Sequence, residues 1–232
     1  MGAVRVGLLV PAAGRGERLG AGTPKAFVEL RGEPIVLRTL KRLVEFRGFV
    51  LGITLVPPLH VDTFRTLAGA FAWPFPVEGV AGGAERQSSV WRGLEALGDA
   101  VDIVVVHDAV RPLVSVAMVE ACVETAREHG AALTAVPVHD TLKRVADGRV
   151  VSTVDRRGLW VAQTPQAFRV PLLRQAHRRA VEVGYQATDD GALVEWAGTP
   201  PRIVLGDPLN LKITTPADLR LAGHLLGLAA PT

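Results

Sequence analysis

Residues 11–25 of the sequence combine small residues with cations in a pattern that suits phosphate chemistry. The segment reads PAAGRGERLGAGTPK. Its small residues let backbone amides approach a polyanion closely, and Arg18 and Lys25 can neutralise charge on a departing pyrophosphate. The segment is not a Walker A sequence, which needs Gly-Lys-Ser/Thr. It is not a GxGxxG fingerprint either, because Leu19 stands where the third glycine belongs. The alternative is a tight turn with two solvated cations.

A second segment whose residue types could take part in binding or catalysis is HDAVRP, residues 107–112. It directly follows an apolar run. A buried parallel strand delivers the residues after it to the carboxyl edge of the sheet, where open α/β sheets bind ligands. Asp108 is therefore placed to hold Mg²⁺ against phosphate oxygens, and Arg111 to face a substrate phosphate. Asp108 as a helix cap or turn residue is the alternative. For His107 we expect packing in the core or at a hinge.

The segment GGAERQSSV, residues 82–90, places a glycine pair before a predicted helix. Amides and hydroxyls at a helix start can read a base edge or hold a ribose. Taken alone, this segment is only a loop and a cap.

Short apolar runs alternate with amphipathic stretches, which is typical of βαβ units with a parallel sheet buried on both faces. Strands are predicted at residues 4–10, 49–55, 101–106 and 132–136, and near Val77 and Ile203. Helices are predicted at residues 35–46, 61–71, 85–97, 116–128, 172–183, 189–197 and 217–226. The start signals are Ser115 and Thr188 as caps, and Pro171 and Pro216 in first turns.

Residues 142–154 break this alternation, because Asp147 and Gly148 form a turn signal between two charge-studded, β-prone runs. The runs lack a steady apolar face that could be buried in the parent core. We therefore expect residues 138–157 to form a β-arm that leaves the domain and pairs with another subunit. An ordinary surface hairpin is the alternative.

The bulk properties indicate one domain over residues 1–232. The 26 basic and 23 acidic residues give a net charge of +3, far below the surplus typical of a nucleic-acid binder. The single cysteine, Cys122, lies at helical spacing among apolar residues and is expected to fill the core. The opening apolar run is too short for a signal sequence or a membrane span. We expect a cytoplasmic protein that binds neither membranes nor nucleic acid.

Seven motifs in this order resemble the 2-C-methyl-D-erythritol 4-phosphate cytidylyltransferases. They are PAAGRGERLGAGTPK, GGAERQSSV, HDAVRP, HDTLKR, VDRRGLWVAQTPQAF, ATDDGALVE and NLKITTP. The glycine-rich segment alone would indicate only the broad nucleotidyltransferase family of GT-A-like fold. The motifs DTLKR, VDRRGLW and TPQAF are much more specific.

The resemblance implies a Rossmann-like, three-layer nucleotidyltransferase fold, in which the phosphate of methylerythritol phosphate attacks the α-phosphorus of CTP and releases pyrophosphate. It implies Mg²⁺, or another divalent cation, at Asp108, and an active homodimer. The residues implied to stabilise the transition state or position the acceptor are Arg18, Lys25, Arg156 and Lys212. Those implied at the CTP site are Ala12, Ala13, Gly14, Gly82, Ser89 and Asp108. Those implied around the acceptor are Arg111, Thr141, Arg156, Thr164, Thr188 and Lys212, with Thr141 and Arg156 entering the neighbouring subunit's site.

Some of these residues have a purely structural alternative: Thr188 as a helix cap, Lys212 as a cation at a strand end, and Arg156 as one of a solvated pair. The sequence also departs from the family, since Leu209 stands where an acidic residue commonly precedes the asparagine; Asp207, two residues earlier, could substitute.

Other functions compatible with the sequence are a ribitol 5-phosphate cytidylyltransferase, a GT-A glycosyltransferase and a non-catalytic CTP-binding protein. A glycosyltransferase is expected to carry a DxD-type motif at a strand end, and none stands there. The missing third glycine disfavours a dinucleotide-dependent dehydrogenase.

Overall fold

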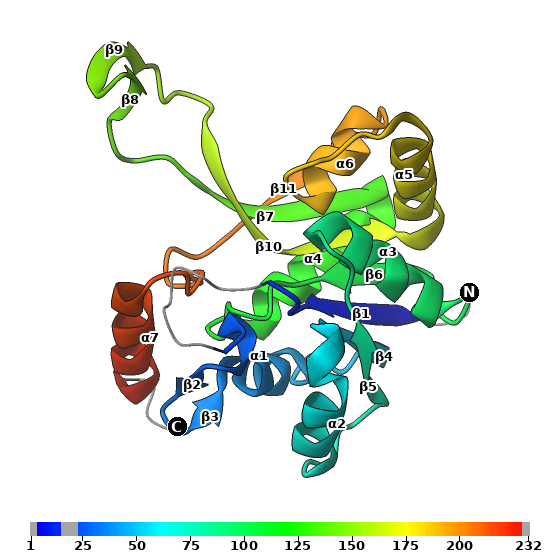
Figure 1. Ribbon diagram of the computed structural model, residues 1–232. Coiled ribbons are helices and arrows are strands. Elements are labelled where there is room, and N and C mark those ends of the chain that lie inside the picture. Colours follow the sequence, from blue (N-terminus) through cyan, green and yellow to red (C-terminus); the bar gives the residue numbers. More distant parts are fainter. Residues whose placement is uncertain (1–3, 15–22, 229–232) are drawn as a thin grey trace.

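A seven-stranded sheet forms the centre of the protein in the computed structural model, which describes residues 4–14 and 23–228 (Figure 1). The strands lie in the order β11 (Arg202–Leu205), β7 (Ala131–Pro137), β10 (Trp160–Arg169), β6 (Ile103–Val106), β1 (Val6–Pro11), β4 (Phe49–Val56) and β5 (Val77–Ala81). Neighbouring strands are parallel, except that β10 is antiparallel to both β6 and β7. The predicted single α/β domain with a mainly parallel sheet is confirmed.

Helices cover both faces of the sheet because successive side chains of a buried strand point in opposite directions. In β1, Leu8 and Val10 belong to one apolar cluster and Leu9 to the other. The first cluster is closed by α1 (Ile35–Leu43), α2 (Val61–Gly69) and α4 (Val116–His129). The second is closed by α3 (Arg86–Leu97), α5 (Val170–Val183) and α6 (Asp190–Trp196). The continuous apolar runs of the sequence are therefore the strands buried on both faces.

The predicted start signals are confirmed for three helices and wrong for one. Ser115 caps α4 by accepting a hydrogen bond from the N–H of Met118 at 3.3 Å. Proline lies in the first turn of α5, at Pro171, and opens α7 (Pro216–Leu228). Asp189 rather than Thr188 caps α6, since its carboxylate accepts the N–H of Ala192 at 2.7 Å. A carboxylate one residue nearer to the helix has taken the position expected for the hydroxyl.

Strand β10 is the long element that the sequence pattern missed. Its middle contains Thr164 and Pro165, and a proline normally argues against a central strand because it lacks the N–H that the ladder needs. The structure accommodates the proline through a break in register between Ala162 and Gln166 opposite β7. The polar side chains of this stretch are buried, against the usual apolar pattern.

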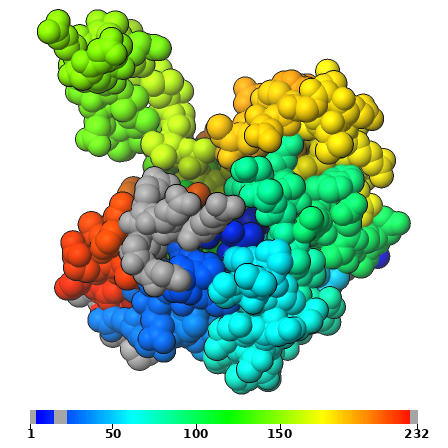
Figure 2. Space-filling view, in the orientation of Figure 1, coloured from blue at the N-terminus to red at the C-terminus, as the bar shows by residue number. Residues whose placement is uncertain are grey.

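The predicted hairpin is confirmed as β8 (Leu142–Ala146) and β9 (Arg149–Val154). Asp147 and Gly148 form its turn with φ values of 48° and 74°, the left-handed conformations that a two-residue hairpin requires. Figures 1 and 2 show this arm standing clear of the body of the protein. Val145 and Val150, which pair across the hairpin, are 56% and 62% exposed. The pairing of the arm with another subunit stays a prediction.

The remaining elements are short or peripheral. They are the 3₁₀ helices η2 (Lys25–Phe27) and η3 (Pro58–His60) and the strand pair β2 (Glu29–Leu30) with β3 (Glu33–Pro34). A third apolar cluster includes Leu30 and Ile35 together with Ile213 and Ala222, so α7 packs against the segment that follows Lys25. Within the described ranges, no helix is long and apolar enough to cross a membrane.

Candidate active site at the carboxyl edge of the sheet

The turn after β1 lies next to Lys25. The N–H of Ala12 donates to the carbonyl of Leu55 at 2.7 Å, which holds the turn at the end of β4. A Cβ added to Gly14 would lie 3.4 Å from Cε of Lys25. The structure therefore brings the small residues Ala12, Ala13 and Gly14 together with Lys25. Arg18 lies outside the described residues.

The loop after β5 packs on this turn. The N–H of Gly82 donates to the carbonyl of Val56 at 2.8 Å. A Cβ at Gly82 would lie only 2.6 Å from Cβ of Ala13, so glycine is what permits the close approach. Residues 12–14 and 82–83 thus form adjoining walls at the carboxyl ends of β1 and β5, the edge at which open α/β sheets bind ligands.

Ser89 supports this loop from inside. It is 1% exposed, and its Oγ accepts the N–H of Gly83 at 2.9 Å and donates to the carbonyl of Glu85 at 2.9 Å. On α3, Arg92 donates to the carbonyl of Gly82 at 2.8 Å. The hydroxyl of Ser89 is therefore engaged within its own loop, and the surface of this wall is formed by the backbone.

Asp108 lies at the end of β6 inside a ring of cations. Its side chain is 10% exposed, and Oδ2 is 2.8 Å from Nζ of Lys212 and 3.5 Å from Nε of Arg111, while Oδ1 is 3.5 Å from Nε of Arg86. Burial raises the pKa of the Asp108 carboxyl, but Arg86, Lys212 and Arg111 outweigh it and hold the pKa well below its usual range. Asp108 is therefore ionised.

Asn210 ties the ring to β10. It is fully buried, and its Nδ2 donates to the carbonyl of Thr164 at 2.8 Å. The carbonyl of Asn210 accepts a hydrogen bond from Nη1 of Arg111 at 2.6 Å. Lys212 follows Asn210 by two residues, so the same anchor places both Arg111 and Lys212 beside Asp108.

His107 is a packing residue, as its position in the sequence suggested. It is fully buried, and its Nε2 lies 3.1 Å from the carbonyl of Arg111, which accepts the N–H. Burial lowers the pKa of His107 to about 4, so the ring is neutral near pH 7. The hydrogen bond fixes the turn that carries Asp108 and Arg111.

Three of the residues predicted around the acceptor substrate show no contact with the Asp108 cluster in the structure. Thr141 and Arg156 flank the hairpin and are exposed, and Nη1 of Arg156 donates to the carbonyl of His139. Thr188 is exposed just before the cap of α6. Thr164, in contrast, is 3% exposed and accepts the N–H of Asp108 on its Oγ1 at 3.0 Å.

Sequence reasoning missed Arg86, Asp190 and Asn210. Nη1 of Arg86 donates to Oδ2 of Asp190 at 2.6 Å, and the Asp190 side chain is 1% exposed. Each of the three lies inside one of the seven motifs, and a charged residue at the second position of a predicted helix is the available signal for Arg86 and Asp190. Their pairing spans 104 residues, which no local pattern reveals.

Among the residues that the structure describes, Asp108 is the candidate ligand for a metal ion. In the described ranges, no three His, Cys, Asp or Glu side chains gather into a ready-made site. Asp207 is exposed and its Oδ1 accepts the N–H of Leu209 at 2.8 Å, a contact within its own turn. One carboxylate suits Mg²⁺, which commonly takes its other ligands from phosphates and water. The donor set therefore fits a cation that arrives with a nucleotide.

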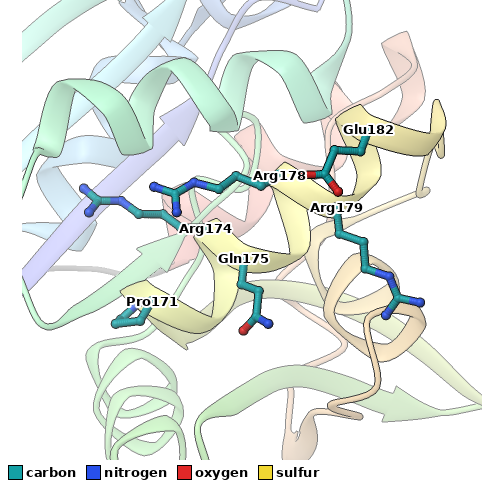
Figure 3. Close-up of a pocket in the computed structure, with 6 residues that line it drawn as sticks. All are labelled: Pro171, Arg174, Gln175, Arg178, Arg179 and Glu182. Carbon is teal, nitrogen blue, oxygen red and sulfur yellow. The ribbon is translucent and has the colours of Figure 1, made fainter.

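A groove of about 520 Å³ runs along the outer face of α5 (Figure 3). It is lined by Pro171, Arg174, Gln175, Arg178, Arg179 and Glu182. Figure 3 shows Arg174 and Arg178 extending to one side of the helix and Arg179 to the other. Arg174 binds Asp99 at 2.7 Å and Arg179 lies over the ring of Trp196 at 4.8 Å. Arg174 thus contacts the turn after α3 and Arg179 the last residue of α6, so the groove is a packing feature of α5.

Comparison with known proteins links this geometry to one family. The family model described as 2-C-methyl-D-erythritol 4-phosphate cytidylyltransferase matches residues 6–227. A protein of that name from Bacillus licheniformis is 43% identical over 219 residues, which cover 94% of both proteins. Its counterpart from Symbiobacterium thermophilum is 45% identical over 224 residues, covering 96% of this chain and 93% of that protein.

Solved structures agree with the sequence matches. The crystal structure of 4-diphosphocytidyl-2C-methyl-D-erythritol synthase from Anaerococcus prevotii has a TM-score of 0.84 at 26% identity, over 97% of this chain and 100% of that one. The 2-C-methyl-D-erythritol 4-phosphate cytidylyltransferase from Thermus thermophilus has a TM-score of 0.79 at 37% identity, over 96% and 98%. The structural similarity therefore extends over nearly the whole chain.

Proposed function

This chain belongs to the 2-C-methyl-D-erythritol 4-phosphate cytidylyltransferase family, and we propose that the cluster around Asp108 is where it joins CTP to the acceptor. The chain transfers a cytidylyl group from CTP to 2-C-methyl-D-erythritol 4-phosphate, a step of isoprenoid precursor synthesis. The acceptor phosphate attacks the α-phosphorus of CTP, the new phosphorus–oxygen bond forms, and pyrophosphate leaves with the electrons of the bond that breaks.

The observation that carries the proposal is the ring of cations beside a glycine turn. Lys212, Arg111 and Arg86 surround Asp108, and Lys25 lies at the turn after β1. Two phosphorylated substrates bring several negative charges into one cleft, and their repulsion must be offset before the reacting atoms approach. Phosphoryl transfer then depends mainly on position and charge stabilisation.

On this basis the two parts of the candidate site receive different roles. The backbone of Ala12, Ala13, Gly14 and Gly82 lines the nucleotide side, and Ser89 shapes that wall from within. Lys25, together with Arg18, stabilises charge on the α-phosphorus and on pyrophosphate. Residues assigned to the acceptor phosphate are Arg111, Thr164, Thr188 and Lys212.

Asp108 is proposed to hold one Mg²⁺ ion with the nucleotide. When bound there, Mg²⁺ would neutralise phosphate charge as a hard cation with oxygen ligands. Asp108 is supported in this role by its ionised state and by its position at the end of β6. Lys212 now contacts Oδ2 of Asp108 at 2.8 Å and is suited to turn to a substrate phosphate instead.

The arm is proposed to make the active protein a homodimer in the cytoplasm. Thr141 and Arg156 flank a hairpin that stands clear of the body and exposes Val145, Val150 and Val151. Apolar side chains on a projecting hairpin favour contact with a second copy of the chain. In that assembly Thr141 and Arg156 would reach the partner's acceptor phosphate.

The decisive experiment mixes the protein with CTP, Mg²⁺ and either 2-C-methyl-D-erythritol 4-phosphate or ribitol 5-phosphate, and measures pyrophosphate. The methylerythritol acceptor should give the higher kcat/KM. A preference for ribitol 5-phosphate would move the assignment to that acceptor. No pyrophosphate with either acceptor would leave only CTP binding, and a nucleoside diphosphate released from a nucleotide sugar would indicate glycosyl transfer.

A further inference from the structure

Arg86 lies between the carboxylates of Asp190 and Asp108 and is closer to that of Asp190. From the first turn of α3, its Nη1 reaches Oδ2 of Asp190 at 2.6 Å, a short charge-assisted hydrogen bond. Its Nε stays 3.5 Å from Oδ1 of Asp108, longer than a good hydrogen bond. Arg86 is therefore bound to Asp190 and only adjacent to Asp108.

Asp190 is built to hold this arginine. Its side chain is 1% exposed at the start of α6, and a buried carboxylate needs a charged partner. Another basic group nearby is His177, whose Nε2 lies 4.0 Å from Oδ1 of Asp190 and whose ring packs against Trp91. Burial lowers the pKa of His177, with Asp190 raising it and Arg86 lowering it, so the ring is neutral near pH 7. Arg86 is the cation that satisfies Asp190.

The guanidinium also retains an unused donor. Nη2 of Arg86 is buried without a hydrogen-bond partner among the described atoms. A buried unpaired donor costs free energy, so Arg86 would gain by turning toward a second acceptor. The bond to Asp190 opposes that movement.

The two oxygens of Asp108 are consequently in different situations. Oδ2 is contacted by Lys212 at 2.8 Å, whereas Oδ1 has Arg86 at 3.5 Å. Oδ1 is thus the oxygen better placed to accept a metal ion, provided that Arg86 does not close on it. A guanidinium in full contact would compete with the ion for the same lone pairs.

We infer that Asp190 is a positioning residue that holds Arg86 away from Asp108 and so keeps Oδ1 available to a divalent cation. The inference rests on the proposed role of Asp108 as the metal ligand. Groups one step outside a metal's own ligands commonly change metal affinity by roughly 10–100-fold when substituted, by orienting or releasing those ligands.

The test measures metal binding rather than turnover. Mn²⁺ is titrated at saturating CTP, without acceptor, and free Mn²⁺ is followed by electron paramagnetic resonance. Asp190→Asn should raise the Mn²⁺ Kd by about tenfold, because Arg86 is released toward Asp108. The double variant Arg86→Met/Asp190→Asn removes both charges together and should bring the Kd back to the wild-type value or below it.

The matched control is Asp99→Asn. Asp99 also pairs with an arginine, Arg174, at 2.7 Å, but at the opposite end of α3. Its loss should leave the Mn²⁺ Kd within about twofold. Folding of each variant is checked by circular dichroism. If Asp190→Asn does not fold, the double variant decides the question, because it leaves no unpaired buried charge. It should bind Mn²⁺ at least as tightly as wild type.

Asp108→Asn separates failure of the inference from failure of its premise. If Asp108→Asn weakens Mn²⁺ binding while Asp190→Asn does not, the positioning role is overturned and the metal ligand stands. A double variant as weak as Asp190→Asn also overturns it, since a merely structural defect would not be reversed. If Asp108→Asn has no effect, the metal assignment and the inference fall together, whereas cytidylyl transfer is still judged by pyrophosphate release.

Discussion

The backbone N–H of Asp108 donates a hydrogen bond to Oγ1 of Thr164 at 3.0 Å. This contact joins the end of β6 to the middle of β10, and both groups are buried. Asp108 is thereby fixed from its backbone, independently of the cations that surround its carboxylate. The carbonyl of the same threonine accepts from Asn210, so Thr164 connects Asp108 to the segment that carries Lys212.

Replacing Thr164 with Val should therefore lower both stability and activity. Valine keeps the shape but leaves the N–H of Asp108 buried without a partner, at a cost of about 1–3 kcal/mol in the free energy of unfolding. Urea denaturation measures this cost. Thr164→Ser retains the hydroxyl and is the control. Equal stability of the Val variant and wild type would show that the hydrogen bond contributes nothing.

Lys25→Ala should reduce kcat by about a hundredfold or more without unfolding the protein, because the ammonium group is proposed to act chiefly in the transition state. Arg18→Ala is expected to behave alike. Steady-state kinetics with CTP and the acceptor measure the effect. The control is Lys41→Ala. Lys41 lies on α1 and pairs with Glu33, so this variant should retain most turnover. Near-normal kcat in Lys25→Ala would contradict the mechanism.

Arg156→Ala should raise KM for the acceptor phosphate by about tenfold, since a hydrogen bond to a charged group is lost, and should change the KM for CTP little. Arg157 offers a matched control, because it is exposed and binds the neighbouring Asp155 at 2.5 Å. Arg157→Ala should leave both constants unchanged. An unaltered acceptor KM in Arg156→Ala would remove Arg156 from the acceptor site.

Removing the apolar pair of the arm should weaken dimerisation. Val145→Ser/Val150→Ser replaces two exposed valines that face each other across the hairpin. Analytical ultracentrifugation should show a shift toward monomer, and deletion of the tip at Asp147 and Gly148 should do the same. Val183→Ser, at another exposed valine on α5, is the control. A dimer of unchanged affinity would place the interface elsewhere.

Acid should destabilise the protein partly through His177. Burial holds its pKa below the ordinary value of about 6.5, so below that pH the unfolded chain binds a proton that the folded chain does not. The free energy of unfolding should fall as pH drops through and below about 6.5. His177→Gln should make the difference between about pH 7.5 and about pH 5 smaller, as measured by urea denaturation. His139→Gln, at an exposed position, should not; equal pH dependence in His177→Gln would refute this role.

The order and type of most helices and strands follow from the sequence by itself, because these elements depend on local patterns. Continuous apolar runs predicted the strands buried on both faces, and Asp147 with Gly148 predicted the hairpin. Helix starts followed from Ser115 and the prolines. The exception, β10, failed for a physical reason: its buried polar side chains have partners far away in the sequence. Gln163 donates to the carbonyl of Asp207, Oγ1 of Thr164 accepts the N–H of Asp108, and Gln166 donates to Asp189. Pro165 is accommodated by the break in register opposite β7.

The tertiary structure alone decided what surrounds Asp108. Lys212, Arg86 and Arg111 come from three separate segments, and the ion pair of Arg86 with Asp190 joins residues 104 positions apart. Local propensity does not determine which strand ends meet at one edge of the sheet. Nor does it determine which of two carboxylates, Asp190 or Asp108, the guanidinium of Arg86 binds. Those choices arise from sheet order and from the need of each buried charge for a partner.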